Sequence, residues 1–181
     1  MDRHNRFEQK LRDDNCKTHT LHEVYEVYIL SRNFDFQNIT QQFLDKLESR
    51  GVLSSRDRKG IQLAYNEALL NAHEHGNLEL KSEWKEELGD SGTDKFSEIK
   101  AIRLQEPNFA NREIKIRLEL KDNELILSVQ DEGAGFTPPP IKPVEGNLYS
   151  HGRGIQLIRH FMDSVEYKKD GRLIEIRKRI G

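Results

Sequence analysis

The stretch of the chain that decides the fold is Asn66–Asn77, which reads NEALLNAHEHGN. It contains no proline and a single glycine, and its apolar residues recur at helical spacing, so we expect the last turns of a helix that Gly76 ends. Glu67, Asn71 and His75 follow one another at intervals of four, which places their side chains on one face of that helix. A carboxylate and a carboxamide one turn apart can divide two tasks, because one handles a proton while the other donates an oxygen to a cation such as Mg²⁺.

Two glycine-containing segments follow later in the chain. Residues 131–135, Asp-Glu-Gly-Ala-Gly, come directly after an alternating apolar run that predicts a strand. Residues 151–154, His-Gly-Arg-Gly, precede a run with helical spacing. Glycines in the first segment give the backbone freedom, and the backbone N–H groups that open a helix in the second favour phosphate oxygens.

An acidic–amide helix, an Asp-x-Gly-x-Gly turn and a Gly-x-Gly helix entrance, in this order, resemble the N, G1 and G2 boxes of the GHKL ATPase superfamily. Within it, the chain most resembles the bacterial anti-sigma-factor serine/threonine kinases, over roughly residues 20–180. Each motif alone is a weak signal, but the ordered set is specific. The resemblance implies a two-layer α/β sandwich with helices on one face of a mainly antiparallel sheet, and it implies ATP and Mg²⁺ as cofactors.

The resemblance also implies a role for each site residue. Glu67 is the general base that orients a hydroxyl or a water toward the γ-phosphate. Asn71 binds the Mg²⁺ that bridges the nucleotide phosphates. Asp131 accepts a hydrogen bond from the exocyclic amine of adenine, which discriminates against guanine. Taken alone, Glu67 would be a solvated helix residue and Asp131 an ordinary turn residue. The nucleotide-binding glycines are Gly133, Gly135, Gly152 and Gly154.

Several residues near these motifs leave alternatives open. His75 shapes the nucleotide pocket or caps the helix, and Arg153 pairs with a phosphate or with a partner protein. The proline-rich residues 137–150 form either the ATP lid of the superfamily or a stiff surface loop. His73 lies off the stripe of site residues and is expected to be inert, and Asn66 is expected to be structural or exposed.

Composition limits the kinds of protein that the chain can be. Its 181 residues suit one domain, and its net charge of −2 gives no basic field for nucleic acid. One third of the residues are charged, no long apolar run suggests a membrane span, and the N-terminus lacks an apolar signal core. The single cysteine, Cys16, cannot form an internal disulfide. We therefore expect a cytoplasmic protein.

Periodicity and turn residues predict an α+β order of elements. Residues 1–20 form a polar tail, and residues 21–181 form a single ATP-binding domain with a helical insertion at about 78–111. The insertion is expected to hold two short amphipathic helices joined by a turn at 89–92, with Trp84, Leu88, Phe96, Ile99, Ile102 and Leu104 as apolar anchors. The other expected elements are a strand at 21–30, helices capped by Asp35 and by Ser54 or Ser55, a hairpin at 114–129, a helix near 152–163 and a hairpin around 169–171.

The leading functional hypothesis is an anti-sigma factor and protein serine/threonine kinase. It would phosphorylate an anti-sigma-factor antagonist and sequester an RNA polymerase sigma factor. The alternative is an ATP-gated binding module without efficient kinase activity. The catalytic domain of a sensor histidine kinase is disfavoured, because about 20 polar residues precede the first expected strand, and gyrase-like or chaperone-like ATPases need a second domain. The apolar strand 21–30 also predicts a homodimer.

Overall fold

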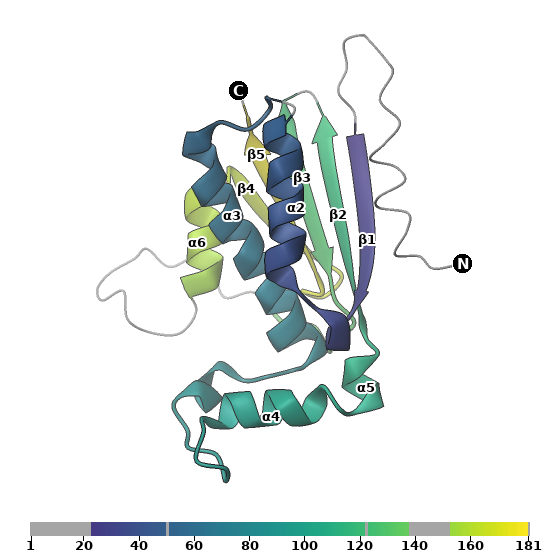
Figure 1. Cartoon of the computed structure of the whole chain (residues 1–181), viewed down its shortest axis with the longest axis vertical. Coiled ribbons are helices and arrows are strands. Elements are labelled where there is room, and N and C mark those ends of the chain that lie inside the picture. The colour runs from purple at the N-terminus through teal and green to yellow at the C-terminus, as the bar shows by residue number, and fades with distance from the viewer. Residues whose placement is uncertain (1–22, 50, 122, 138–152, 181) are drawn as a thin grey trace.

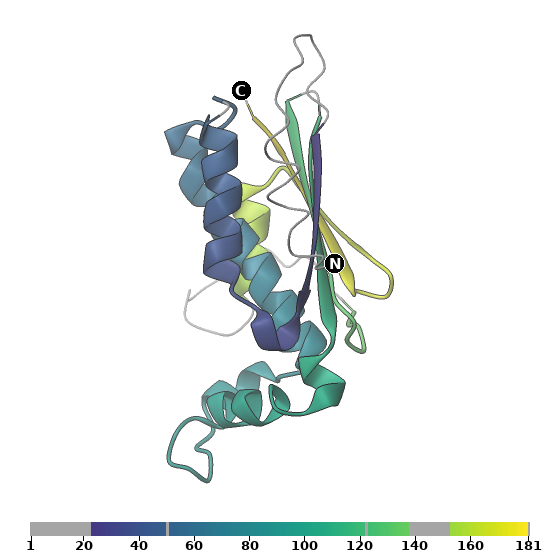
Figure 2. The same ribbon diagram turned by 45° about the vertical axis from the view of Figure 1, so that its right-hand side comes forward.

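The described part of the chain folds into a five-stranded antiparallel sheet that is covered by helices on one face (Figures 1 and 2). The structure is a computed structural model, and it describes residues 23–49, 51–121, 123–137 and 153–180. The strand order is β1-β2-β3-β5-β4, which confirms the predicted α+β class. The strands are β1 (Glu23–Leu30), β2 (Glu113–Lys121), β3 (Glu124–Gln130), β4 (Ser164–Lys168) and β5 (Leu173–Arg179).

Three helices, α2 (Phe36–Ser49), α3 (Ser55–Leu70) and α6 (Arg153–Phe161), form the second layer (Figure 2). The predicted caps are present: the backbone N–H of Asn38 donates to Asp35 Oδ1 over 3.2 Å, and that of Asp57 donates to Ser54 Oγ over 3.2 Å. None of the described helices has the length and hydrophobicity that crossing a membrane requires.

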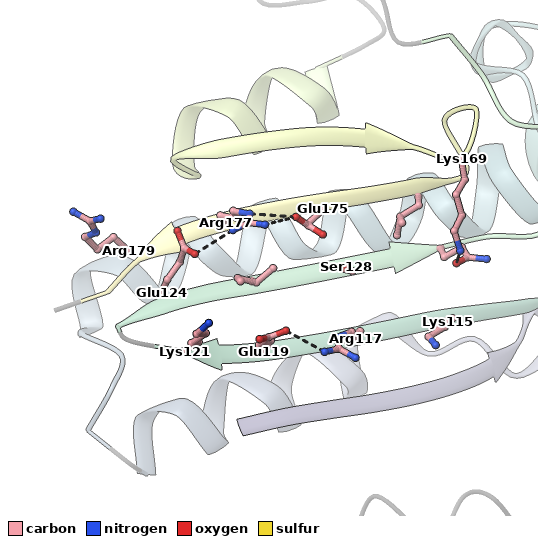
Figure 3. A pocket seen from close by; sticks show the side chains of 13 residues that line it. Lys115, Arg117, Glu119, Lys121, Glu124, Ser128, Lys169, Glu175, Arg177 and Arg179 are labelled. Atoms are coloured by element: carbon pink, nitrogen blue, oxygen red, sulfur yellow. Dashed lines mark hydrogen bonds and ion pairs between the residues drawn. The ribbon is translucent and has the colours of Figure 1, made fainter. Parts of the chain in front are cut away.

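Alternation along the strands separates an apolar face from a polar one. Every second residue of β2, beginning with Ile114, is buried, and β3 follows the same pattern. These side chains meet α2 and α3 in the main core, in which Leu44, Ala64 and Leu69 are fully buried. Figure 3 shows the opposite face, where charged side chains of β2, β3 and β5 pair with one another, for example Arg177 Nη2 with Glu175 at 2.7 Å.

The helix that carries the site does not end as predicted. After Leu70 the chain continues as a π-helical segment, Asn71–Asn77, so the helical path runs through Gly76. The expectation that Gly76 stops the helix was therefore wrong. A Cβ at this position would overlap the Asp131 carboxyl group, so glycine is required by the close approach of another segment. π-Helical turns of this kind are frequent at functional sites.

The insertion is less regular than predicted and forms a separate body at one end of the sandwich (Figure 1). Its first predicted helix is only the 3₁₀ turn Ser82–Lys85, and its second is α4 (Lys95–Arg103), followed by a short helix, α5 (Pro107–Ala110), that was not predicted. Leu78, Leu80 and Phe96 form a small core of its own, against which Trp84, Ile99, Leu104 and Phe109 pack. The predicted anchors Leu88 and Ile102 are instead 80% and 52% exposed.

Asn77 joins the end of the π-helical segment to the 3₁₀ turn Ser31–Asn33, to the start of β2 and to the loop after β3. Its side chain is fully buried, and its Nδ2 donates to Ser31 Oγ over 2.9 Å and to the Glu113 carbonyl over 3.1 Å. Its Oδ1 accepts the backbone N–H of Glu132 at 2.7 Å. Both the N–H and the carbonyl side of the amide are therefore hydrogen-bonded, and the side chain fixes the segment against the start of β2 and the loop after β3.

Replacing Asn77 with alanine should strongly destabilise the fold. Asn77→Ala leaves the backbone N–H of Glu132 and the carbonyl of Glu113, both in partly buried hydrogen bonds, without these partners, which costs up to about 1–3 kcal/mol for each group. Asn66→Ala is the matched control, because Asn66 accepts one hydrogen bond, from Thr40 Oγ1 at 2.7 Å. Urea unfolding should show a loss of about 2–5 kcal/mol for Asn77→Ala and about 1 kcal/mol for Asn66→Ala. Equal losses of stability in the two variants would contradict the proposal that Asn77 holds these segments together.

Candidate functional site

Six of the predicted site residues meet in one cavity of about 820 Å³. Its size falls in the range of small-molecule sites. It lies where α3, the π-helical segment, the loop after β3, the first turn of α6 and the 3₁₀ turn of the insertion approach one another. The predicted residues that line it are Glu67, Asn71, His75, Asp131, Gly135 and Gly154.

Of the other predicted residues, only Gly133 is fully described. Gly133 contacts the backbone of Gly76 beside the cavity. Gly152, residues 138–150 of the predicted lid, the 1–20 tail and Cys16 lie outside the described residues. Arg153 is the first residue of α6, but its side chain is outside the described part, so its two alternatives stay open.

The side chains of Glu67 and Asn71 face the N-terminus of α6. A Cβ on Gly154 would overlap Glu67 Oε2 and would lie 3.4 Å from Asn71 Nδ2. The first N–H groups of a helix have no partners within the helix and carry a partial positive charge, so this end of the cavity suits an anion. Burial raises the pKa of Glu67, an effect that the nearby Lys85 opposes. A carboxylate with a raised pKa is a better proton acceptor.

Asp131 lies against Gly76, nine residues further along the helical path than Glu67, and therefore toward the other end of the cavity. Its side chain is only 8% exposed. The backbone N–H of Gly133 donates to its Oδ1 over 2.8 Å. Burial raises the pKa of the Asp131 carboxyl to about 6, against the opposing effects of that hydrogen bond and of Arg172. A Cβ on Gly133 would overlap the carbonyl oxygen of Gly76, so this glycine serves the contact between two backbones and not only an approaching ligand.

Aromatic residues that the sequence analysis did not identify line the cavity near Asp131. The rings of Phe136 and Tyr167 meet edge to face with centroids 5.3 Å apart. The Tyr167 hydroxyl is buried and has no hydrogen-bond partner among the described residues. The two rings add apolar surface to the cavity that also holds the Asp131 acceptor, a combination that suits a heteroaromatic ring. Tyr167 was missed because strand alternation alone does not show which inward residue reaches a cavity.

The two histidines of the motif have different roles. His73, which was expected to be inert, is buried, stacks on Phe34 with centroids 4.3 Å apart and contacts the Ser31 carbonyl through Nε2 at 3.0 Å. It has a structural role and does not line the cavity. His75 lines the cavity, and its Nδ1 lies 2.6 Å from the Leu80 carbonyl. Because a carbonyl only accepts, Nδ1 carries the proton and the insertion fixes the orientation of the ring.

Comparison with known families gives one match. Residues 99–178 match the family model of the histidine kinase-like ATPase domain. The match covers Asp131, Gly135 and Gly154 but begins after the helix of Glu67 and Asn71, and it spans less than half of the chain. No curated protein matches the chain.

The match and the fold together support a histidine kinase-like ATPase domain of the GHKL superfamily. Domains of this type bind ATP, generally with Mg²⁺. The helix that carries Glu67 and Asn71 lies outside the matched region, and its connection to the ATPase features rests on the geometry of the cavity.

Two buried groups should make stability depend on pH in opposite directions. The pKa of Asp131 is raised to about 6 in the folded protein, so the stabilisation of its protonated form is lost as the pH rises through 6. Burial lowers the pKa of His73 to about 4, so below its unfolded pKa stability is lost as the pH falls toward 4. In wild type the two effects largely cancel between pH 4 and 6.5.

The Asp131→Asn variant removes one of these effects. Its free energy of unfolding should rise by about 2–3 kcal/mol more than that of wild type between pH 4 and 6.5, because only the His73 dependence remains. Urea unfolding at a series of pH values measures this difference, in which the titrations shared by both proteins cancel. Parallel curves for the two proteins would show that Asp131 titrates as it does in the unfolded chain.

Proposed function

We propose that the protein binds Mg-ATP in this cavity and is an anti-sigma factor and protein serine/threonine kinase. The observation that carries the proposal is the convergence of Glu67, Asn71 and the N-terminus of α6 at one end of a cavity whose other end holds Asp131. The end with Glu67, Asn71 and the N-terminus of α6 suits a metal-bound polyphosphate, and the end with Asp131 suits adenine. The two ends belong to one cavity of suitable volume, so a single nucleotide can engage both.

The residues present fit the cofactors chemically. The Asn71 amide oxygen is a hard ligand of the kind that Mg²⁺ accepts beside phosphate oxygens and water. The N–H groups that open α6 can donate to phosphate. Glu67 lies beside Asn71 and the start of α6. Its carboxylate can accept the proton of a serine or threonine hydroxyl as that hydroxyl attacks the γ-phosphate. Mg²⁺ would supply charge neutralisation for the transferred group.

At the adenine end, the Asp131 carboxylate is an acceptor for an exocyclic amine. Guanine would place a keto oxygen opposite that carboxylate, which leaves two acceptors facing each other. Phe136 and Tyr167 provide apolar surface for the base. Gly135 has a φ of 81°, a conformation that favours glycine, and so lets the loop turn under the base.

The proposed partners are an anti-sigma-factor antagonist and an RNA polymerase sigma factor, engaged by a homodimer. Supporting the dimer, β1 is an edge strand of the sheet, and its Tyr28 is 39% exposed on the outer side. An edge strand offers unpaired backbone groups to a second chain. Light scattering at tens of micromolar measures the mass, and copurification with sigma factors tests the partners. A monomer that retains no sigma factor would count against this part of the proposal.

Nucleotide choice tests the assignment of Asp131. Wild type should bind ATP and ADP far better than GTP, and Asp131→Asn should weaken ATP binding by about 1–3 kcal/mol through loss of a charge-assisted hydrogen bond. Asp170→Asn is the control, because the Asp170 side chain is 91% exposed in the β4–β5 turn. Isothermal titration calorimetry measures all three proteins. Equal affinity of wild type for ATP and GTP would reject the assignment.

Two further variants separate chemistry from binding. Glu67→Gln keeps the shape of the side chain but removes its basic oxygen, so it should bind ATP nearly as wild type and transfer phosphate roughly 10²-fold more slowly or worse. Asn71→Ala should instead weaken the Mg²⁺-dependent part of nucleotide binding.

Transfer of ³²P from the γ-position of ATP to a cognate antagonist measures the first effect, and calorimetry with and without Mg²⁺ measures the second. Glu83→Gln, an exposed residue of the insertion, is the control for the charge change. Transfer at the wild-type rate by Glu67→Gln would show that Glu67 is not the base. Binding of ATP by wild type without any transfer would favour the ATP-gated binding module.

A further inference from the structure

The charges that line the cavity are unbalanced for a ligand that carries several phosphates. Four carboxylates line it, and Lys85 is the single lysine or arginine among the described lining residues. The carboxylates are those of Glu67, Glu74, Glu86 and Asp131. A polyanion placed beside them would be repelled unless cations offset the charge. Mg²⁺ can offset part of it, and Lys85 is the cation that the described chain itself supplies.

Lys85 reaches the cavity from the 3₁₀ turn of the insertion, which no motif of the sequence analysis covers. Its Nζ lies 3.9 Å from Glu74 Oε2 and 4.4 Å from the centroid of the Phe96 ring. The side chain is 48% exposed, so it is not locked in place. A lysine ammonium on a flexible four-carbon stem can swing between two acceptors at low cost.

Glu74 does not depend on Lys85 for its charge balance. Its side chain is only 13% exposed, and its Oε1 accepts Lys100 Nζ at 2.7 Å. Lys85 is therefore a second cation beside Glu74, which already has a closer partner in Lys100. If Lys85 moves toward a ligand, Glu74 stays paired and no buried charge is left alone.

Lys85 also acts on the carboxylate that faces α6. Its charge acts on Glu67, whose burial-raised pKa it lowers, and Glu67 lies against Gly154 at the start of α6. Among the groups whose charges act on Asp131, the cations are Arg172 and Arg112. The charge of Lys85 therefore reaches the proposed phosphate end of the cavity.

We propose that Lys85 is a phosphate-binding residue that the insertion contributes to the nucleotide site. The inference rests on the proposed function, because it assumes that an adenine nucleotide occupies the cavity. Lys85 leaves Glu74 and donates to a phosphate oxygen of the bound nucleotide, while Lys100 holds Glu74. The insertion thereby contributes a ligand-binding side chain to the site. Nucleotide binding then draws the 3₁₀ turn toward α6.

A phosphate-binding lysine has a distinctive signature. Its contribution grows with the number of phosphates on the ligand, since the ammonium acts as a point charge. It contributes nothing to adenosine, which has no phosphate. A lysine that only stabilised the insertion would affect the binding of ATP, ADP and adenosine equally.

The experiment compares Lys85→Met with Lys81→Met by calorimetry with ATP, ADP and adenosine at constant Mg²⁺. Methionine keeps the length and apolar stem of lysine and removes the charge. Lys81 is the control because it lies four residues before Lys85, is exposed, and has its Nζ 5.7 Å from the centroid of Trp84, outside the cavity lining. Lys85→Met should weaken ATP binding about tenfold or more and ADP binding less, in line with a lost charge-assisted hydrogen bond at a half-exposed site. Adenosine binding should not change, and Lys81→Met should bind every ligand as wild type does.

The outcomes separate the inference from the proposed function. Wild-type protein that binds no adenine nucleotide would overturn the proposed function and the inference with it. Wild-type binding of ATP that Lys85→Met retains in full would overturn the inference alone. Equal weakening of ATP and adenosine would also overturn it, because it would assign Lys85 a structural role. Lys85→Arg should restore most of the affinity, since it restores the charge.

Discussion

The site depends on one contact between two backbones. The π-helical segment Asn71–Asn77 and the loop after β3 touch so closely that a Cβ on Gly133 would overlap the Gly76 carbonyl oxygen. Asn77 then holds the two together through the backbone N–H of Glu132. Because this contact fixes Glu67 and Asn71 relative to Asp131, it sets the distance between the two ends of the cavity. Interiors are close-packed, so neither segment can shift without the other.

The parts of the fold that depend on local spacing could be predicted from the sequence. Alternating apolar residues gave β2 and β3, and the cap residues Asp35 and Ser54 gave the starts of α2 and α3. The interval of four between Glu67 and Asn71 places both in the cavity. Each of these features is decided within a few residues along the chain, where periodicity and capping act.

The features that could not be predicted from the sequence depend on contacts between residues that are far apart along the chain. The π-helical segment is held by Asn77, whose partners are Ser31, Glu113 and Glu132. Gly76 looked like a helix terminator because its neighbour in space, Asp131, is distant in the sequence. Lys85 belongs to no motif, and only its position against Glu74 brings it to the site. Local patterns contain none of this information.

The insertion begins and ends at the same point of the fold. Its first residue, Leu78, follows Asn77, and near its end Arg112 donates through Nη1 to the Asn77 carbonyl over 2.7 Å. Arg103 bonds back to the Leu78 carbonyl. A segment whose two ends are held together in this way can grow or shrink at small entropic cost, because the cost of closing a loop rises only slowly with length. The same fold can therefore exchange this module for a longer or shorter one, and with it the cation at the cavity, while the sheet and its core stay as they are.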